Sequence, residues 1–341
     1  MTLADVVALV LLLAITAYAC GGGTDYGAGF WDLMAGGADR GERPRALIDY
    51  AMAPVWEANN VWLVFVLVVM WTGFPTLLAA VFSTVWIALV LGVFGLVLRG
   101  AGFAFRKPTR RLASRRRYGA MFGISSILTP FFFAAAIGGV ASGRVRVDSR
   151  GDPVTSWLNP TSITFGVLTT AATAFIGAVF LQQDARRFAG AGLVEYFRRR
   201  ALGSAAVMLL VGIAGLVVLR YDARYVFDGL LRGSGLAFVI LALASAMVTV
   251  VLVARDTSRG VRVAAVATVG STVFAWGLAQ RPYVLPTTLT VQEAAGNPHT
   301  LWWLVFVTVV AVLLVVPALA ILYRLDTTGR LPAEDGESAD G

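Results

Sequence analysis

The chain has 341 residues, of which 58% are hydrophobic and 14% are charged, and its formal net charge at pH 7 is +8. Soluble domains are about 45–50% apolar and about 25% charged, so this composition excludes an ordinary soluble protein. Cys20 is the only cysteine and His299 the only histidine, which excludes an internal disulfide, a cysteine-based metal site and bis-histidine haem ligation within this chain.

Runs of about 20 apolar residues recur along nearly the whole chain, which is the pattern of an all-α polytopic membrane protein. The basic residues lie between these runs, so the positive charge does not indicate nucleic-acid binding. The second and third runs are separated only by Thr72-Gly73-Phe74-Pro75, a sequence that favours a tight turn. Nine spans are predicted, at residues 3–20, 54–71, 75–98, 118–140, 161–182, 202–219, 234–254, 262–280 and 301–322.

We expect one transmembrane domain over residues 1–325 and a disordered cytoplasmic tail over residues 326–341, because the tail is acidic and small. The longest predicted loop, about residues 21–53, has too little apolar content for a core of its own. The glycine-rich segment Gly21–Gly29 follows a membrane span rather than a strand, so it does not indicate a nucleotide-binding loop.

The distribution of basic residues predicts how the chain lies in the membrane. With the N-terminus outside, the cytoplasmic loops hold 21 Lys and Arg residues, eight of them from Arg99 to Arg117, and the outer loops hold 7. Cytoplasmic loops of membrane proteins carry such an excess. The sequence therefore predicts an outer N-terminus, a cytoplasmic C-terminus and an odd number of spans.

The strongest functional signal is an acid at the entrance to the second span. Glu57 lies in Trp-Glu-Ala-Asn-Asn-Val-Trp, and no charged residue occurs from Val61 to Leu98. An acid at membrane depth costs on the order of 3 kcal/mol unless it is protonated or paired, and such groups serve mainly to move protons, ions or substrates.

Two interpretations of this segment stay open. In the first, Glu57 caps a helix N-terminus at the interface and Trp56 and Trp62 belong to the aromatic belt. In the second, Glu57 is a proton-relay carboxylate, and Asn59 and Asn60 hold water beside it.

Asp25 is the second candidate acid. It follows the first span, on the same predicted cytoplasmic side as Glu57, and it is either a solvated loop acid or a second relay group. His299 precedes the last span at its outer end, where a lone histidine is more often solvated than a ligand.

These segments resemble subunit II of cytochrome bd quinol oxidase. Pro54–Leu63 is similar to the family's Trp-Asp-Gly-Asn-Gln-Val-Trp-Leu signature, and Thr24–Gly29 looks like its Gly-Phe-Asp-X-Gly-Val-Gly segment. Further matches follow in the family's order along the chain, at Phe74–Ser83, Leu98–Arg106 and Tyr283–Ala295.

The resemblance implies nine transmembrane helices arranged as two four-helix bundles plus one peripheral helix. It implies a subunit of a bacterial terminal oxidase in the cytoplasmic membrane, which oxidises quinol and reduces O₂ to water. The haems, of types b and d or a b-type variant, then belong to the larger partner, subunit I. This chain would bind no haem or metal and hold no catalytic residue, but would stabilise subunit I and line a cytoplasmic proton path.

Site residues carry over from the resemblance one by one. Glu57 takes the place of the proton-path aspartate, with Asn59 and Asn60 beside it and Trp56 and Trp62 in support. Asp25 matches the second acid of an Asp-Gly-Phe-Asp pattern, whose first acid falls at Gly22. The exact proton route therefore stays open, as do the quinone used, a small single-span subunit, and a structural quinone or membrane lipid on this chain.

A secondary transporter is the alternative class. Its signature would be a pair of Gly- or Pro-broken helices in an inverted repeat, with polar groups at mid-membrane. The sequence shows no such duplication. A purely structural scaffold is the remaining interpretation, in which substitution of Glu57 leaves turnover unchanged.

Overall fold

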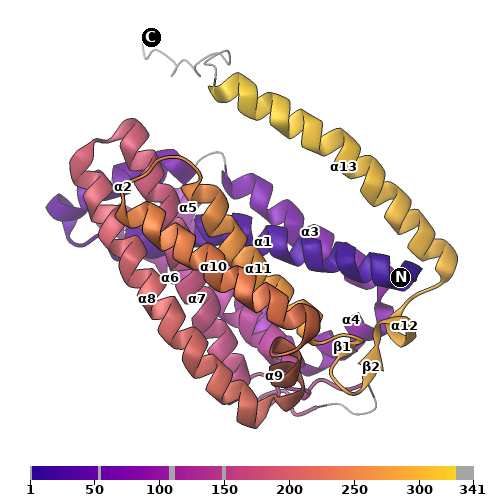
Figure 1. Ribbon diagram of the computed structural model, residues 1–341. Helices are drawn as coiled ribbons and strands as arrows, with labels where there is room; N and C mark the ends of the chain where they lie inside the picture. The colour runs from indigo at the N-terminus through magenta and orange to yellow at the C-terminus, as the bar shows by residue number, and fades with distance from the viewer. Residues whose placement is uncertain (1, 53–54, 107–111, 148–150, 328–341) are drawn as a thin grey trace.

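The computed structural model describes residues 2–52, 55–106, 112–147 and 151–327, and this part of the chain is almost entirely helical. Most of the long apolar helices lie side by side (Figure 1). The elements are α1 (Leu3–Leu33), α2 (Ala38–Met52), α3 (Val55–Gly73), α4 (Pro75–Thr84), α5 (Trp86–Arg106), α6 (Leu112–Ala141), α7 (Pro160–Phe188), α8 (Ala191–Asp222), α9 (Arg224–Leu230), α10 (Gly233–Ala254), α11 (Val261–Ala279), β1 (Tyr283–Leu285), β2 (Leu289–Thr290), α12 (Val291–Ala294) and α13 (Pro298–Thr327).

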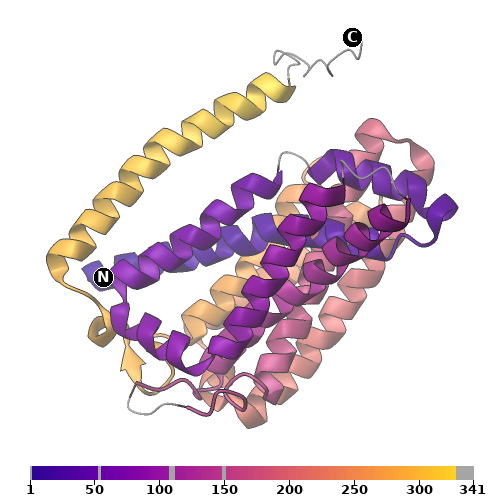
Figure 2. The ribbon, with the colours of Figure 1, turned by 180° about the vertical axis from the view of Figure 1, so that it is seen from behind.

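The last helix stands apart from the bundle. Both views show α13 in yellow, leaving the other helices at the end where the N-terminus lies (Figure 1, Figure 2). Near its start, Leu301 packs in a core cluster with Val7 of α1 and Val69 of α3, and the antiparallel β1–β2 hairpin adds Leu285 to the same cluster. Most described residues farther along α13 are exposed, as expected of a helix that faces lipid or a partner.

The described helices support a multi-pass membrane protein. Six of them are long and apolar enough to cross a membrane: Leu3–Leu33, Arg117–Ala141, Pro160–Phe188, Ala191–Asp222, Gly233–Ala254 and Val261–Ala279. Asn59–Gly73 and Pro75–Thr84 together pass the same test as one bent pair, while Trp86–Gly102 and Pro298–Leu314 are shorter apolar helices.

The predicted third span, residues 75–98, is wrong in its bounds. The chain bends by 117° between α3 and α4, because Pro75 takes the first position of a new helix and has no N–H to continue the previous one. The helix α4 ends at Thr84, and α5 then runs from Trp86 to Arg106. Arg99, predicted to begin a cytoplasmic loop, therefore lies inside α5.

The predicted loop after residue 20 is also wrong, because α1 continues as one helix to Leu33. Its glycines remain helical where two helices approach closely. A Cβ atom on Gly27 would lie 2.0 Å from the carbonyl oxygen of Thr173, and Gly177 of α7 faces it with no side chain of its own. Small residues permit this kind of approach in membrane bundles. Asp25 consequently lies on a buried helix face and not in a loop.

Candidate functional site

A buried ion pair joins α1 to α5 inside the bundle. Arg99 is 0% exposed and Asp25 is 3% exposed. One guanidinium nitrogen of Arg99, Nη2, lies 2.7 Å from Oδ1 of Asp25 and 2.9 Å from the Asp25 carbonyl oxygen. The solvated-loop interpretation of Asp25 is therefore wrong, and the acid has a strong charged partner within the apolar part of the protein.

The helix α6 completes the surroundings of this pair. Nη1 of Arg99 donates to the hydroxyl of Ser126, which in turn donates to the carbonyl oxygen of Phe122. The Cζ atom of Arg99 lies 4.2 Å from the ring centroid of Phe122 and 4.8 Å from that of Tyr26. Charge, hydrogen bonds and two aromatic faces thus compensate a guanidinium that burial alone would strongly disfavour.

Two tyrosines extend the polar region along α1. The hydroxyl oxygens of Tyr18 and Tyr26 are 2.8 Å apart, two helical turns along the same face. Tyr26 is itself buried and contacts Arg99 through its ring. The ion pair and the tyrosine hydroxyls therefore form a nearly continuous row of polar groups in an apolar helix.

The third helix brings Asn59 to this row. Asn59 is 2% exposed, and among the described residues its Oδ1 atom has no hydrogen-bond partner. A Cβ atom on Gly22 would lie 2.8 Å from Nδ2 of Asn59. The amide thus occupies the space over Gly22, where the family resemblance places an acid, and Gly22 is one helical turn from Asp25. An unpaired buried oxygen of this kind is an acceptor for water or for another donor.

The other residues predicted around Glu57 do not join this polar row. Trp56 and Glu57 lie in the first turn of α3, but their side chains fall outside the described part of the chain. Asn60 is partly exposed, and Trp62 is exposed and contacts Phe65 edge-on. Only Asn59 among the described motif residues therefore points to Gly22 and the Asp25 region.

His299 lies apart from this site, at the exposed start of α13, where its backbone N–H donates to the Asn297 side chain. Within the described residues, no group of three or more His, Cys, Asp and Glu side chains is placed to hold a metal ion.

Sequence reasoning missed Arg99, Ser126, Tyr18 and Tyr26 as members of the site. A third span that begins at Pro75 places Arg99 in the loop that follows it. Because a separate short helix covers residues 75–84, the next helix begins only at Trp86, and Arg99 lies buried inside it. The available signal was the pair Gly73 and Pro75, which marks a helix break as well as a turn.

Three comparisons with known proteins agree with one another. The profile of the family described as "Cytochrome bd terminal oxidase subunit II" matches residues 3–326. Cytochrome bd-I ubiquinol oxidase subunit 2 of Escherichia coli (strain K12) is 24% identical over 365 residues, covering 96% of this chain and 95% of that protein. A putative cytochrome bd menaquinol oxidase subunit II of Bacillus subtilis (strain 168) is 22% identical over 320 residues, covering 88% of this chain and 89% of that protein.

The fold comparison points the same way. A chain in the structure of bd oxidase from Geobacillus thermodenitrificans matches with a TM-score of 0.80 and 24% sequence identity. The match covers 95% of this chain and 98% of that chain, so the two share a fold along their whole length. None of these findings supports the transporter alternative.

Proposed function

Because this chain belongs to the cytochrome bd terminal oxidase subunit II family, we propose that it is the haem-free subunit of a bd-type quinol oxidase in a bacterial cytoplasmic membrane. The haems and all catalytic residues are assigned to the larger subunit I, where quinol is oxidised and O₂ is reduced to water. The presence of a single histidine in the whole sequence supports this division.

The proposed membrane arrangement has nine spans in one domain over residues 1–325. The helices α3, α5 and α13 join the six long apolar helices, and α13 is the peripheral one. The four-helix bundles are α1, α3, α5 and α6, and α7, α8, α10 and α11, within which α5 packs on α6 and α10 on α11. The arginine distribution supports an outer N-terminus and a cytoplasmic C-terminus, although nearly all of the predicted tail, residues 326–341, lies outside the described residues.

This chain is proposed to line a path for protons from the cytoplasm toward subunit I. The observation that carries this proposal is the buried Asp25–Arg99 pair, because ionisable groups are rare inside membrane spans and usually belong to such paths. Glu57 and Asn60 stand at the start of α3, and Asn59 leads from there to Gly22 and Asp25.

Each residue of the proposed path has a simple role in moving or positioning protons. Glu57 accepts a cytoplasmic proton, and Asn59 orders water through its unpaired Oδ1 atom. Arg99 holds Asp25 in one position through hydrogen bonds to its carboxyl group and to its backbone carbonyl oxygen. Protons consumed in O₂ reduction then come from one side of the membrane, which builds a potential without a pump.

The assignment can be tested by purifying the tagged chain in mild detergent and recording a reduced-minus-oxidised optical spectrum. We expect a larger, histidine-bearing membrane subunit to co-purify, with absorption bands of b- and d-type haems. A small additional band on the gel would reveal a single-span subunit. A colourless chain that purifies alone would contradict the proposed complex.

A further inference from the structure

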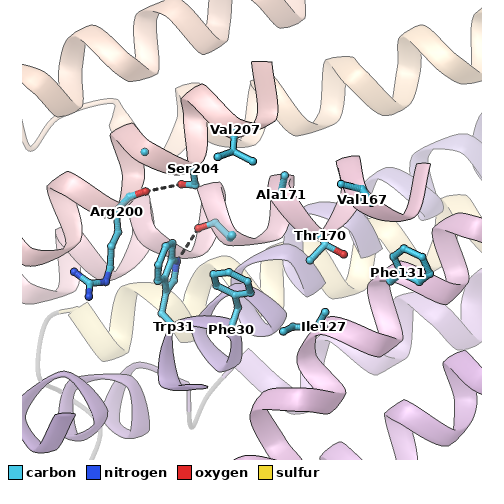
Figure 3. Close-up of a pocket in the computed structure, with 12 residues that line it drawn as sticks. Phe30, Trp31, Ile127, Phe131, Val167, Thr170, Ala171, Arg200, Ser204 and Val207 are labelled. Atoms are coloured by element: carbon cyan, nitrogen blue, oxygen red, sulfur yellow. Dashed lines mark hydrogen bonds between the residues drawn. The ribbon is translucent and has the colours of Figure 1, made fainter. Parts of the chain in front are cut away.

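A groove of about 520 Å³ lies between α1, α6, α7 and α8, a size within the range of ligand sites. We name it the Arg200 groove. Figure 3 shows Arg200 and Trp31 near one end of its lining, and Val167 and Phe131 near the other. Its lining residues are Phe30, Trp31, Ile127, Phe131, Val167, Thr170, Ala171, Ala174, Arg200, Gly203, Ser204 and Val207.

The polar groups of the lining are nearly all engaged within the protein. The Ser204 hydroxyl donates to the Arg200 carbonyl oxygen at 2.7 Å, and the Thr170 hydroxyl donates to that of Gly166 at 2.9 Å. The indole N–H of Trp31 donates to the Ala174 carbonyl oxygen at 2.8 Å. The groove therefore offers a ligand an apolar wall along its length and one cationic group at its end.

That cation has donors to spare. The guanidinium of Arg200 lies over the Tyr196 ring, 3.2 Å from its centroid, and donates once to the Tyr196 carbonyl oxygen. Its Nε atom is buried with no hydrogen-bond partner. Among the described residues no carboxylate pairs with Arg200, whereas its neighbours Arg198 and Arg199 both pair with Glu195.

The groove also lies at the depth that a lipid requires. No charged residue occurs in α8 from Ala201 to Leu219, so Arg200 marks the boundary between the headgroup and hydrocarbon regions. From Arg200 to Val207 the helix rises about 10 Å into the apolar region. Val207 is exposed on this face, so the groove opens toward the lipid.

We propose that the Arg200 groove binds an anionic phospholipid, with the phosphate on Arg200 and one acyl chain along the apolar wall. Charge complementarity favours this occupant, because a quinone has no anionic group for the guanidinium, and the phosphate of a zwitterionic lipid is already offset by that lipid's own ammonium group. The proposal needs only the membrane placement of the chain and is independent of the oxidase assignment.

The test is native mass spectrometry of the purified membrane protein, with its co-purifying subunits, titrated with dioleoylphosphatidylglycerol or dioleoylphosphatidylcholine. We expect phosphatidylglycerol to bind more tightly, and Arg200→Gln to weaken its binding about tenfold, as expected for loss of one charge-assisted contact. Arg199→Gln is the matched control, because Arg199 is 78% exposed and lies off the groove, and we expect it to bind as the wild type does.

A second variant tests the acyl-chain part separately. A Cβ atom on Gly203 meets nothing within 4 Å, so Gly203→Leu fills the groove without a clash at that atom, and we expect it to displace the lipid too. Unchanged phosphatidylglycerol binding in Arg200→Gln would overturn the proposal, as would a quinone in the solvent extract that is lost from Gly203→Leu. The readout uses neither haem content nor turnover, so its failure leaves the proposed function untouched.

Discussion

Two aspartate–arginine pairs in this molecule have similar contact distances and opposite surroundings. Asp25 and Arg99 are 2.7 Å apart in the interior, whereas Asp222 and Arg144 are 2.6 Å apart with side chains 16% and 35% exposed. Asp222 ends α8 and also accepts hydrogen bonds from the backbone N–H and hydroxyl of Thr161, at the start of α7. The outer pair therefore helps to hold the end of α8 against the start of α7, which is a structural role.

The inner pair also joins helices, but it does so inside the apolar interior. It joins α1, α5 and α6 through groups that apolar side chains could replace, and burying two charges usually gains little stability. This cost of burial is the reason why the pair is proposed to serve proton transfer. The two ion pairs therefore differ in their burial and not in their contact distance.

The largest effect is expected from breaking the inner pair on one side. Arg99→Met leaves Asp25 buried without its cation, which costs about 3–5 kcal/mol in comparable cases. Thermal unfolding of the purified protein in detergent should show a large loss of stability.

The double variant Asp25→Leu with Arg99→Met is its control. Since both charges are removed together, we expect most of the lost stability to return. Turnover should be low in both the single and the double variant, because the proposed path has lost its buried pair. An Arg99→Met protein as stable as the wild type would contradict the claim that Asp25 depends on Arg99 inside the protein.

The next effect concerns the entrance to the proposed path. Glu57→Gln removes the proton-accepting group with little change of shape, and we expect O₂ reduction to slow by roughly 10²-fold, as is typical for loss of one proton-transfer group. Assembly and haem content should stay near normal. Glu195→Gln, which alters a surface acid paired with two arginines, should leave turnover unchanged. Normal turnover in Glu57→Gln would leave only the interfacial-cap interpretation.

A smaller effect is expected at the outer pair. Arg144→Met removes a partly exposed contact, and such pairs contribute about 0–1 kcal/mol. The thermal midpoint should fall slightly, with O₂ reduction unchanged. A loss of stability as large as that of Arg99→Met would mean that burial does not distinguish the two pairs.

The smallest effect is a pH dependence outside the membrane. At the start of α12 the backbone N–H and hydroxyl of the N-cap residue Thr290 donate to Glu293, which lowers the pKa of Glu293 below its ordinary value of 4.5. A carboxyl whose pKa is lower in the folded state stabilises it above pH 4.5, and this stabilisation is lost as the pH falls through the folded-state value.

The wild type should therefore be slightly more stable than Glu293→Gln at neutral pH, and the difference should vanish in acid. Thermal unfolding of both proteins across this pH range measures it. A difference that persists or grows in acid would assign the stabilisation to something other than the charge.

Much of the fold could be predicted because membrane spans depend on local composition. Apolar runs of the right length mark α7, α8, α10 and α11 wherever loops with arginine separate them. The wrong predictions concern segments whose composition does not reveal their structure. Pro75 separates two helices within one uncharged run. The glycines of α1 resemble a loop in sequence, but they are helical because α7 packs closely against them.

The candidate site was only half accessible to sequence reasoning. The acids Asp25 and Glu57 stand out because charges are rare in apolar segments. Their partners do not, since Arg99 is 74 positions from Asp25 and Ser126 lies in a different helix again. No local sequence pattern predicts these contacts, because they depend on how α1, α5 and α6 pack.

The most direct test of the central claim is the rate of O₂ reduction per haem in Asp25→Asn, measured in the purified complex with quinol as electron donor. Asparagine keeps the size of the side chain and an acceptor oxygen for Arg99, but it cannot carry a proton. Asp222→Asn at the outer pair is the matched control. We expect turnover per haem to fall strongly in Asp25→Asn, even though this variant is also less stable, and to stay normal in Asp222→Asn. Equal turnover in both variants would contradict a proton path through the buried pair.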